Sequence, residues 1–233
     1  MSFPGAALTP LLALRQRRRL RKGWGRLGGR VFVISSPSGG GKTTVVKQVQ
    51  KQLPRLLRSV SVTTRAPRPR ERSGRDYRFV ASGRFRHLIR SKQLLEWAKV
   101  HDAYYGTPRR PVMEALARGR DVILSIDVQG ARQVRRALGK HATLIFLLPP
   151  SMADLRRRLT QRRTETPAAV RRRLAAAKRE LACAAWYDHR VVNDRLTTTV
   201  REVKEIVEAE MLRGNMQTKG AEGAWRRWRS KNS

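Results

Sequence analysis

The sequence predicts an α/β protein whose parallel sheet core is flanked by helices, and two observations support this prediction. Short apolar, β-branched runs at 31–34, 121–126 and 142–148 alternate with segments of helical composition, a pattern typical of parallel strands joined by crossover helices. Between 59 and 100 the alternation gives way to short strand-like pieces around one helical segment. We therefore expect the core to carry a small inserted lobe.

The expected elements follow the chain in a regular order. A strand at 31–34 leads through a glycine-rich loop into a helix at 42–53, which is the succession of strand, turn and helix. The other expected elements are strand-like pieces at 59–62, 76–80 and 94–100 with a helix at 84–91, then a strand at 121–126, a helix at 131–138, a strand at 142–148, helices at 152–163 and 167–185, a strand at 191–192 and a helix at 198–212.

The chain is strongly basic. Its 233 residues include 52 Lys plus Arg against 17 Asp plus Glu, a formal charge of +35. The length favours one compact domain with tails over two full domains. A charge of this size attracts polyanions such as nucleic acid, acidic lipid or phosphorylated ligands, so we expect an anionic partner.

Both ends of the chain are expected to lie outside the folded domain, which we place at 30–212. Residues 1–29 are rich in arginine and contain no acid, the first acid being Glu71. This segment is interpreted either as a disordered basic arm or as an organelle transit peptide. Residues 213–233 form a basic tail with a Trp-Arg-Arg-Trp-Arg run. The two basic ends are candidate contacts for RNA or another polyanion.

The sequence argues against a membrane span, a disulfide and a histidine metal site. The apolar stretch at 3–14 is only about half as long as a span requires, and its basic residues follow it instead of preceding it as in a secretory signal. Cys183 is the single cysteine, and the four histidines lack ligand spacing. We expect a reducing compartment, namely the cytoplasm, or a mitochondrion or plastid if 1–29 is a transit peptide.

A glycine-rich loop follows the first predicted strand and leads into a helix. In this context backbone N–H groups and a helix N-terminus bind phosphate, a lysine bridges the terminal phosphates and a hydroxyl holds Mg²⁺. Lys42 and Thr43 suit these two roles. Ser36 stands where the pattern G-x-x-x-x-G-K-[ST] has its first glycine, and the alternative is an ordinary glycine-rich connection. The residues predicted to hold a nucleoside triphosphate are Ser36, Pro37, Ser38, Gly39, Gly40, Gly41, Lys42, Thr43 and Thr44.

Further motifs follow the loop along the chain. They are Ser61-Val62-Thr63-Thr64-Arg65-Ala66-Pro67-Arg68-Pro69, Asp76-Tyr77-Arg78-Phe79-Val80, Leu95-Glu96, Tyr104-Tyr105-Gly106-Thr107, Ile126-Asp127-Val128-Gln129-Gly130, Pro149-Pro150-Ser151, Arg158-Leu159, Arg173-Leu174 and Val192-Asn193-Asp194. Each motif is modest alone, but together they resemble the guanylate kinase family in order and spacing, from about residue 30 to 210.

The resemblance implies an enzyme that transfers the terminal phosphoryl group of ATP to GMP with the help of Mg²⁺. It implies a P-loop core, a GMP-binding lobe at about 61–107 and a helical lid at about 158–173. The implied GMP-binding residues are Ser61, Arg65, Arg68, Tyr77, Glu96, Tyr105, Thr107 and Asp127. The implied catalytic residues are Lys42, Arg68, Arg158, Arg162 and Arg173.

Elementary chemistry agrees with this assignment. Guanine presents N1–H and its exocyclic amine as adjacent donors that one carboxylate accepts together, whereas adenine leaves such an acceptor unpaired. Glu96 and Asp127 are two of only 17 acids, and both stand where the family has carboxylates. The planar fork of arginine suits a monophosphate. For Tyr77 and Tyr105, packing in the core is the alternative role.

Two positions depart from the family pattern. Ser125 stands two residues before Asp127, where the family usually has a second carboxylate near Mg²⁺, and a neutral hydroxyl is a poorer partner for that ion. Arg163 replaces a glycine usual in the lid. The alternatives are a binding module that has lost catalysis, an RNA-binding protein, and a P-loop kinase for another acceptor. Both a monomer and a homodimer are compatible with the sequence.

Overall fold

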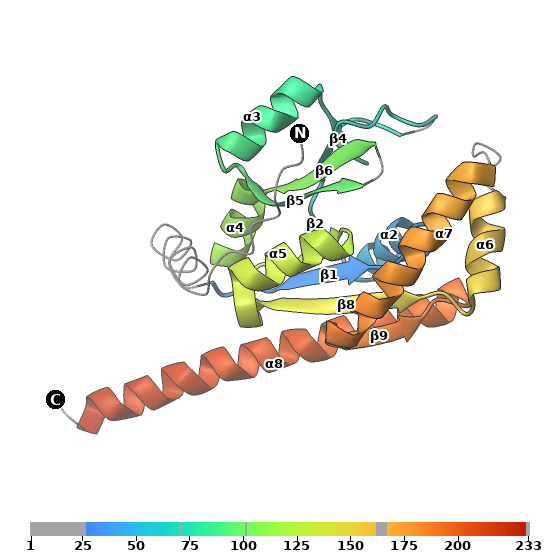
Figure 1. Ribbon diagram of the computed structural model, residues 1–233. Helices are drawn as coiled ribbons and strands as arrows, with labels where there is room; N and C mark the ends of the chain where they lie inside the picture. Colours follow the sequence, from blue (N-terminus) through green and yellow to red (C-terminus); the bar gives the residue numbers. More distant parts are fainter. Residues whose placement is uncertain (1–26, 70, 101, 162–166, 232–233) are drawn as a thin grey trace.

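Two sheets organise the chain (Figure 1). The computed structural model describes residues 27–69, 71–100, 102–161 and 167–231, and their side chains except those of 167–168 and 214–231. The strands of the first sheet, in spatial order, are β2 (Leu57–Arg58), β7 (Val122–Ser125), β1 (Val31–Ser35), β8 (Ala142–Leu148) and β9 (His189–Val192).

Every pairing in the first sheet is parallel. In the central strand β1, Val33 lies opposite Leu124 of β7 on one side and Leu144 of β8 on the other. All five residues of β1 are buried, which explains its continuous apolar run, because a parallel sheet is covered on both faces. The predicted parallel-sheet core is confirmed.

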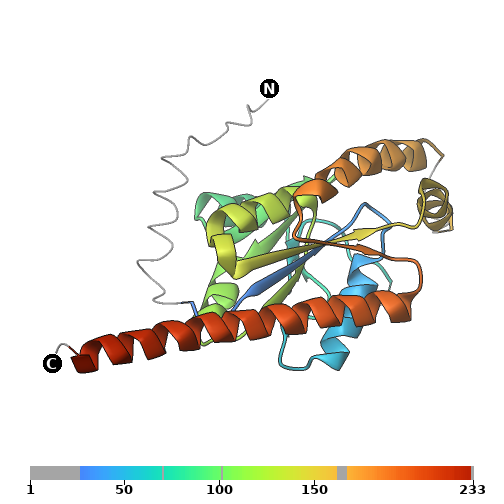
Figure 2. The same cartoon turned by 90° about the horizontal axis from the view of Figure 1, so that it is seen from below.

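Helices cover both faces of this sheet (Figures 1 and 2). They are α4 (Arg109–Ala117) and α5 (Val128–Leu138) on one face, and α2 (Lys42–Gln52) and the long α8 (Leu196–Lys231) on the other. Leu116 and Val134 are fully buried on the first face, and Val49 and Val203 on the second. Among the described residues, no helix is long and apolar enough to cross a membrane.

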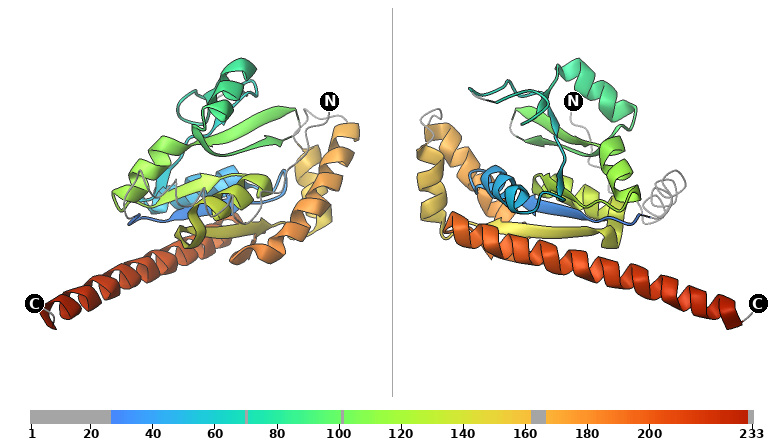
Figure 3. Two further views of the ribbon diagram at one scale, coloured as in Figure 1. Left: turned by 60° about the vertical axis from the view of Figure 1, so that its left-hand side comes forward. Right: turned by 180° about the vertical axis from the view of Figure 1, so that it is seen from behind.

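The second sheet is mixed and carries one helix. Its strands, in spatial order, are β4 (Arg78–Phe79), β3 (Val62–Thr63), β6 (Ala103–Pro108) and β5 (Leu94–Val100). Helix α3 (Ser82–Arg90) covers the side that faces away from the parallel sheet (Figures 1 and 3). A β-bulge between Leu94 and Glu96 directs these two side chains to opposite sides of the sheet. The expected inserted lobe is therefore a sheet with its own small core.

Two further helices form an arm at one end of the parallel sheet (Figure 3). They are α6 (Met152–Thr160) and α7 (Pro167–Ala182). Leu155, Leu159 and Ala177 are buried where the two helices pack together. The Ser151 hydroxyl accepts a hydrogen bond from the Asp154 N–H at 3.0 Å and so caps α6. The lid predicted at about 158–173 would span the end of α6 and the start of α7, and its residues 162–166 lie outside the described chain.

Several boundaries differ from the predictions. The helix expected at 198–212 runs from Leu196 to Lys231, because the Glu, Lys, Arg and Ala residues beyond 212 favour helix more than the scattered glycines oppose it. Helix α7 ends at Ala182 and is followed by a 3₁₀ turn, η2 (Cys183–Trp186), so the helix expected at 167–185 is too long.

The predictions omitted β2, β6 and α4. Gly106 and Pro108 make β6 a poor strand by composition, yet it pairs with both β3 and β5, which outweighs the local preference. Helix α4 contains Pro111, which lies in the first turn, where a missing N–H breaks no helical hydrogen bond.

Candidate nucleotide site

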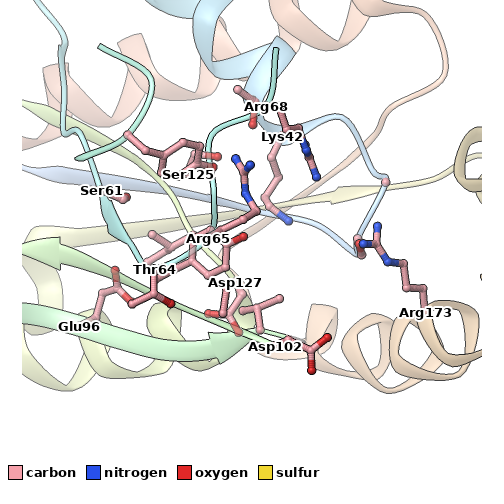
Figure 4. A pocket seen from close by; sticks show the side chains of 18 residues that line it. Lys42, Ser61, Thr64, Arg65, Arg68, Glu96, Asp102, Ser125, Asp127 and Arg173 are labelled. Carbon is pink, nitrogen blue, oxygen red and sulfur yellow. The ribbon is translucent and has the colours of Figure 1, made fainter. Parts of the chain in front are cut away.

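A cavity of about 510 Å³ lies between the glycine loop after β1 and the second sheet. Figure 4 shows Glu96 toward one end of it and Arg173 toward the other, with Lys42 and Arg65 between them. The lining residues are Ser38, Gly39, Lys42, Thr43, Ser61, Thr64, Arg65, Arg68, Tyr77, Glu96, Val100, Asp102, Ala103, Tyr105, Ser125, Ile126, Asp127 and Arg173. Residues from the core, the inserted lobe and α7 thus meet in one cavity.

The glycine loop forms one wall of the cavity. Gly39 and Gly41 have φ values of +87° and +85°, in the left-handed region that glycine adopts at little cost. The Lys42 ammonium donates a hydrogen bond to the Ser36 carbonyl oxygen at 2.6 Å, so its side chain folds back over the loop. Thr43, in the first turn of α2, also lines the cavity. A loop of this shape presents N–H groups and a helix N-terminus to an anion.

Two side chains hold the loop from outside the predicted site. The Asn193 amide donates a hydrogen bond to the Gly40 carbonyl oxygen at 2.8 Å. Glu180 of α7 accepts one from the Ser38 N–H at 3.3 Å. Burial raises the pKa of Glu180, while the Lys42 charge opposes the rise. Sequence reasoning missed Glu180. The one feature that could have identified it is that it is an acid on an otherwise basic helix.

Glu96 is buried at the lobe end of the cavity, with 3% of its surface exposed. The Thr107 hydroxyl donates a hydrogen bond to Glu96 Oε1 at 2.5 Å. Burial raises the pKa of Glu96 to about 8, with the Thr107 hydrogen bond opposing the rise and the Asp127 charge adding to it. A Cβ at Gly130 would collide with the Glu96 carboxyl group, so a glycine is needed there. From this raised pKa we expect the Glu96 carboxyl group to carry a proton at neutral pH when no ligand is bound.

Asp127 lies beside Glu96 at the start of α5. Its Oδ1 accepts a hydrogen bond from the Gly130 N–H at 3.0 Å, as a helix N-cap does. Asp127 therefore supports the fold as well as lining the cavity. Ser61 and Ser125 line the cavity too, whereas Thr107 reaches it only through its hydrogen bond to Glu96.

Glu71 organises the arginine segment of the lobe. Its carboxylate accepts hydrogen bonds from Arg65 Nη2 at 2.8 and 2.9 Å and from the Arg68 backbone N–H at 2.8 Å. Although burial alone would raise it, these hydrogen bonds hold the pKa of Glu71 below its usual value. The Arg65 guanidinium lies 5.5 Å from the centre of the Tyr77 ring, and that ring contacts Tyr105 edge-on. Sequence reasoning missed Glu71.

An ion pair joins the core helix α2 to the lobe. Lys47 Nζ lies 2.7 Å from Asp76 Oδ1, and Asp76 also accepts a hydrogen bond from the Arg72 N–H at 3.1 Å. The Lys47 hydrogen bond is the largest of the interactions that hold the pKa of the buried Asp76 far below its usual value. This contact links the loop helix to the lobe.

The predicted catalytic arginines are in different situations. Arg68 and Arg173 line the cavity (Figure 4). Arg158 does not line it and donates a hydrogen bond to the Asn193 carbonyl oxygen at 2.9 Å. Arg162, like Arg163, lies outside the described residues. Of the three predicted catalytic arginines that the structure describes, two line the cavity.

Some lining residues were not predicted. They are Thr64, Val100, Asp102, Ala103 and Ile126. Thr64 and Ile126 belong to quoted motifs without having been assigned a role, and the other three lie on or next to the strand pair β5 and β6, so their position depends on how the strands pair. Among the predicted loop residues, Ser36, Pro37, Gly40, Gly41 and Thr44 belong to the loop or to α2 without lining the cavity.

A phosphate-binding loop that faces a carboxyl-containing pocket, with arginines between them, defines a P-loop kinase of small nucleotides. Comparison with known proteins agrees. Residues 28–210 match the family model described as guanylate kinase. The chain belongs to the guanylate kinase family.

Individual relatives give the same result. The chain is 45% identical to a guanylate kinase of Dechloromonas aromatica over 80% of this chain and 92% of that protein. It is 48% identical to a guanylate kinase of Gloeobacter violaceus over 78% of this chain and 88% of that protein. The crystal structure of guanylate kinase from Anaplasma phagocytophilum superposes with a TM-score of 0.67 at 34% identity, covering 78% of this chain and 86% of that one. The predicted family and fold class are confirmed.

Proposed function

We propose that this chain transfers the terminal phosphoryl group of ATP to GMP, and to dGMP, yielding ADP and GDP in purine nucleotide metabolism. Family membership supports this activity. The observation that carries the choice of acceptor is Glu96, a buried carboxyl group at the lobe end of the cavity.

Glu96 would select guanine by accepting hydrogen bonds from N1–H and the exocyclic amine. Both donors need the ionised carboxylate, so GMP binding would remove the proton that burial retains. Asp127, next to it, would accept from the same edge of the base, and Ser61 and Thr107 would complete the pocket. Adenine offers no matching pair of donors, which leaves a buried acceptor unpaired at a cost of about 1–3 kcal/mol.

Arg65, Arg68, Tyr77 and Tyr105 would hold the GMP phosphate. All four line the cavity. Glu71 neutralises part of the arginine charge while orienting Arg65, so the guanidinium is positioned before a ligand arrives. Positioning of this kind lowers the entropy lost on binding.

ATP would bind with its phosphates on the glycine loop and Lys42. The donors near the loop fit Mg²⁺, because Thr43 and Ser125 supply hydroxyl oxygens and Asp127 a carboxylate in one cavity, and Mg²⁺ keeps several waters when it binds with substrate phosphates. Thr43 would hold the ion. When bound, Mg²⁺ neutralises charge on the triphosphate.

The residues of this chain would act by positioning and by charge. Lys42 and Arg173 line the cavity and would stabilise the phosphoryl group in transfer, with Arg158 and Arg162 joining them from the lid. The GMP phosphate oxygen would attack in line, so no covalent enzyme intermediate is needed. An arginine that stabilises the phosphoryl group in this way raises the rate of phosphoryl transfer by orders of magnitude.

A coupled assay of ADP formation tests this function with GMP, dGMP, AMP, UMP and CMP as acceptors. GMP is expected to be the best acceptor. A higher kcat/KM for AMP or UMP would show that the guanine pocket is wrongly assigned, and GMP binding without transfer would indicate a binding module.

The basic ends support a second, separate proposal. We propose that 1–29 and 213–233 contact RNA or another polyanion, because the chain carries a formal charge of +35 and phosphate contacts release counterions. Deletion of 1–28 and 216–233 is expected to spare kinase activity and weaken salt-sensitive retention on RNA. Equal retention would place the anion-binding surface on the core.

The single cysteine supports a cytoplasmic location.

A further inference from the structure

A second cavity, which we call the rear pocket, lies on the outer side of the second sheet between α3, β4 and the start of α4. Its volume is about 650 Å³. Val62, Val80, Leu88 and Leu94 form its apolar floor, and Val62 and Leu94 belong to the buried cluster beneath α3. The proposed kinase activity makes no use of this pocket.

Five cations and no acid are among the other lining residues of the rear pocket, together with Gln93, Pro108 and Pro111. The cations are Arg78, Arg84, Lys92, Arg109 and Arg110. Arg110 pairs with Glu114 at 2.7 Å, but among the described residues the other four form no ion pair. Like charges gathered around one cavity repel one another unless an anion lies among them.

Arg109 lacks a hydrogen-bond acceptor where it needs one. Its Nε is buried and has no hydrogen-bond partner among the described residues. Burial lowers the pKa of the Arg109 guanidinium. A buried donor without a partner destabilises the protein, and an anion bound beside the Arg109 guanidinium would offset the cost of burying its charge.

Lys92 occupies a backbone position that favours glycine. Its φ is +55°, and no other non-glycine residue of the described chain has a positive φ. The N–H groups of Gln93 and Lys92 donate to the carbonyl oxygens of Leu88 and Ile89, both at 3.0 Å, in the Schellman pattern that ends α3. A lysine costs backbone energy here, and its side chain lines the rear pocket.

One layer of strands separates the rear pocket from the nucleotide cavity. Ser61 lines the nucleotide cavity and its neighbour Val62 lines the rear pocket. Across the β-bulge of β5, Leu94 lines the rear pocket while Glu96 lines the nucleotide cavity. Any ligand that moves these strands from behind also moves Glu96.

We propose that the rear pocket binds a nucleotide, with the base on the apolar floor and the phosphates among the cations, and that this ligand changes the affinity for GMP across the sheet. A nucleotide combines a flat, weakly polar base with several negative charges. Inorganic phosphate has no part that would cover the floor, and a fatty acid carries one charge against four unpaired cations. Free nucleotides and the nucleotides of an RNA strand share this chemistry.

The test measures binding of UTP, inorganic triphosphate and a short oligouridylate to the full chain. GMP and a non-hydrolysable ATP analogue first fill the nucleotide cavity, and UTP lacks the paired donors that Glu96 accepts. We expect saturable UTP binding that Arg84→Glu weakens about tenfold or more, since hydrogen bonds to charged groups are of that strength. Arg86→Glu is the matched control, because Arg86 is also exposed on α3 but does not line the pocket.

A second variant separates ligand binding from folding. Lys92→Gly is expected to weaken UTP binding and to raise the unfolding temperature, because glycine relieves the strained φ. A loss of affinity with a gain in stability is not explained by damage to the fold. Unchanged UTP affinity in both Arg84→Glu and Lys92→Gly would overturn the proposal.

The remaining outcomes also decide. If Arg84→Glu and Arg86→Glu weaken UTP binding equally, the effect comes from the overall charge of the protein, and the proposed site is wrong. If inorganic triphosphate binds as tightly as UTP, the apolar floor does not bind the base. Oligouridylate that binds more tightly than UTP, with the same dependence on Arg84, identifies RNA as the source, and weaker binding identifies free nucleotide. A GMP dissociation constant that UTP leaves unchanged overturns the coupling. Because these measurements involve no turnover, their failure is distinct from failure of the kinase proposal.

Discussion

The glycine loop and the inserted lobe differ in how their binding groups are arranged along the chain. The loop is one contiguous segment, and its N–H groups, helix N-terminus and Lys42 form a surface for phosphate. The lobe gathers side chains from separate segments, among them Arg65 before β4, Glu96 on β5 and Tyr105 on β6. Backbone N–H groups meet every triphosphate alike, so discrimination between bases has to come from the lobe.

The two regions also differ in how charge is handled. Lys42 donates a hydrogen bond to the Ser36 carbonyl oxygen of its own loop. Glu96 is buried beside Asp127, and burial raises its pKa to about 8. On the proposed function, the loop would contribute a cation to catalysis, and the lobe would contribute a carboxyl group that ionises when the correct base binds.

The largest expected effect removes the charge of the loop. Lys42→Ala is expected to lower kcat about a thousandfold, because the phosphoryl group in transfer loses a fixed cation, while the circular dichroism spectrum and unfolding temperature stay close to those of the parent. Lys51→Ala, an exposed lysine on the same helix, is the control and should leave kcat unchanged. Normal turnover in the Lys42 variant would make the loop an ordinary glycine-rich connection.

The next effect concerns the lobe. Glu96→Gln is expected to lower kcat/KM for GMP about a hundredfold, since the amide cannot accept two donors as the carboxylate does, and to leave ATP affinity within about twofold, as expected for an interaction made only with the base. Glu114→Gln on α4 is the matched control. Equal losses in GMP and ATP affinity would mean that Glu96 supports the fold and does not select the base.

A pH experiment sharpens the contrast in charge. Because the pKa of Glu96 is raised from 4.5 to about 8, the folded enzyme holds a proton that the unfolded chain releases. The stability of the ligand-free enzyme should therefore fall as pH rises from about 4.5 to about 8.

By the same linkage, GMP should release about one proton per molecule bound at pH 7, and progressively less above pH 8. Calorimetry in buffers of different ionisation enthalpy measures this release, and Glu96→Gln should abolish it. GMP binding without proton release at pH 7 would show that Glu96 is already ionised.

The smallest expected effect lies where the two regions meet. Ser125 stands where the family usually has a carboxylate, so Ser125→Asp is expected to lower the Mg²⁺ concentration for half-maximal activity about two- to fivefold and to raise kcat slightly, because negative ligands hold the ion more firmly. An inactive parent that binds GMP and is restored by Ser125→Asp would be a natural pseudokinase. If neither the Mg²⁺ requirement nor kcat changes, position 125 does not influence metal binding.

Contiguous segments were predictable from the sequence alone. The strand at 31–34, the loop at 36–43 and the start of α2 follow from an apolar β-branched run, three glycines and a lysine within a few residues. Glu96, Asp127 and the arginines came from the resemblance to the guanylate kinase family, and among the described residues predicted to be catalytic, Arg158 is the one that does not line the cavity.

Other features depend on contacts between distant residues, and only the tertiary structure decided them. Strand β6 exists because two neighbours pair with it, and the bulge in β5 sends Leu94 and Glu96 to opposite cavities. Glu71 and Glu180 are unremarkable acids in sequence, yet one orients Arg65 and the other contacts Ser38 of the loop. The sequence determined the groups that carry the chemistry, because their local order is itself the signal. Pairing, burial and pKa depend on which segments meet, and that is a property of the folded chain.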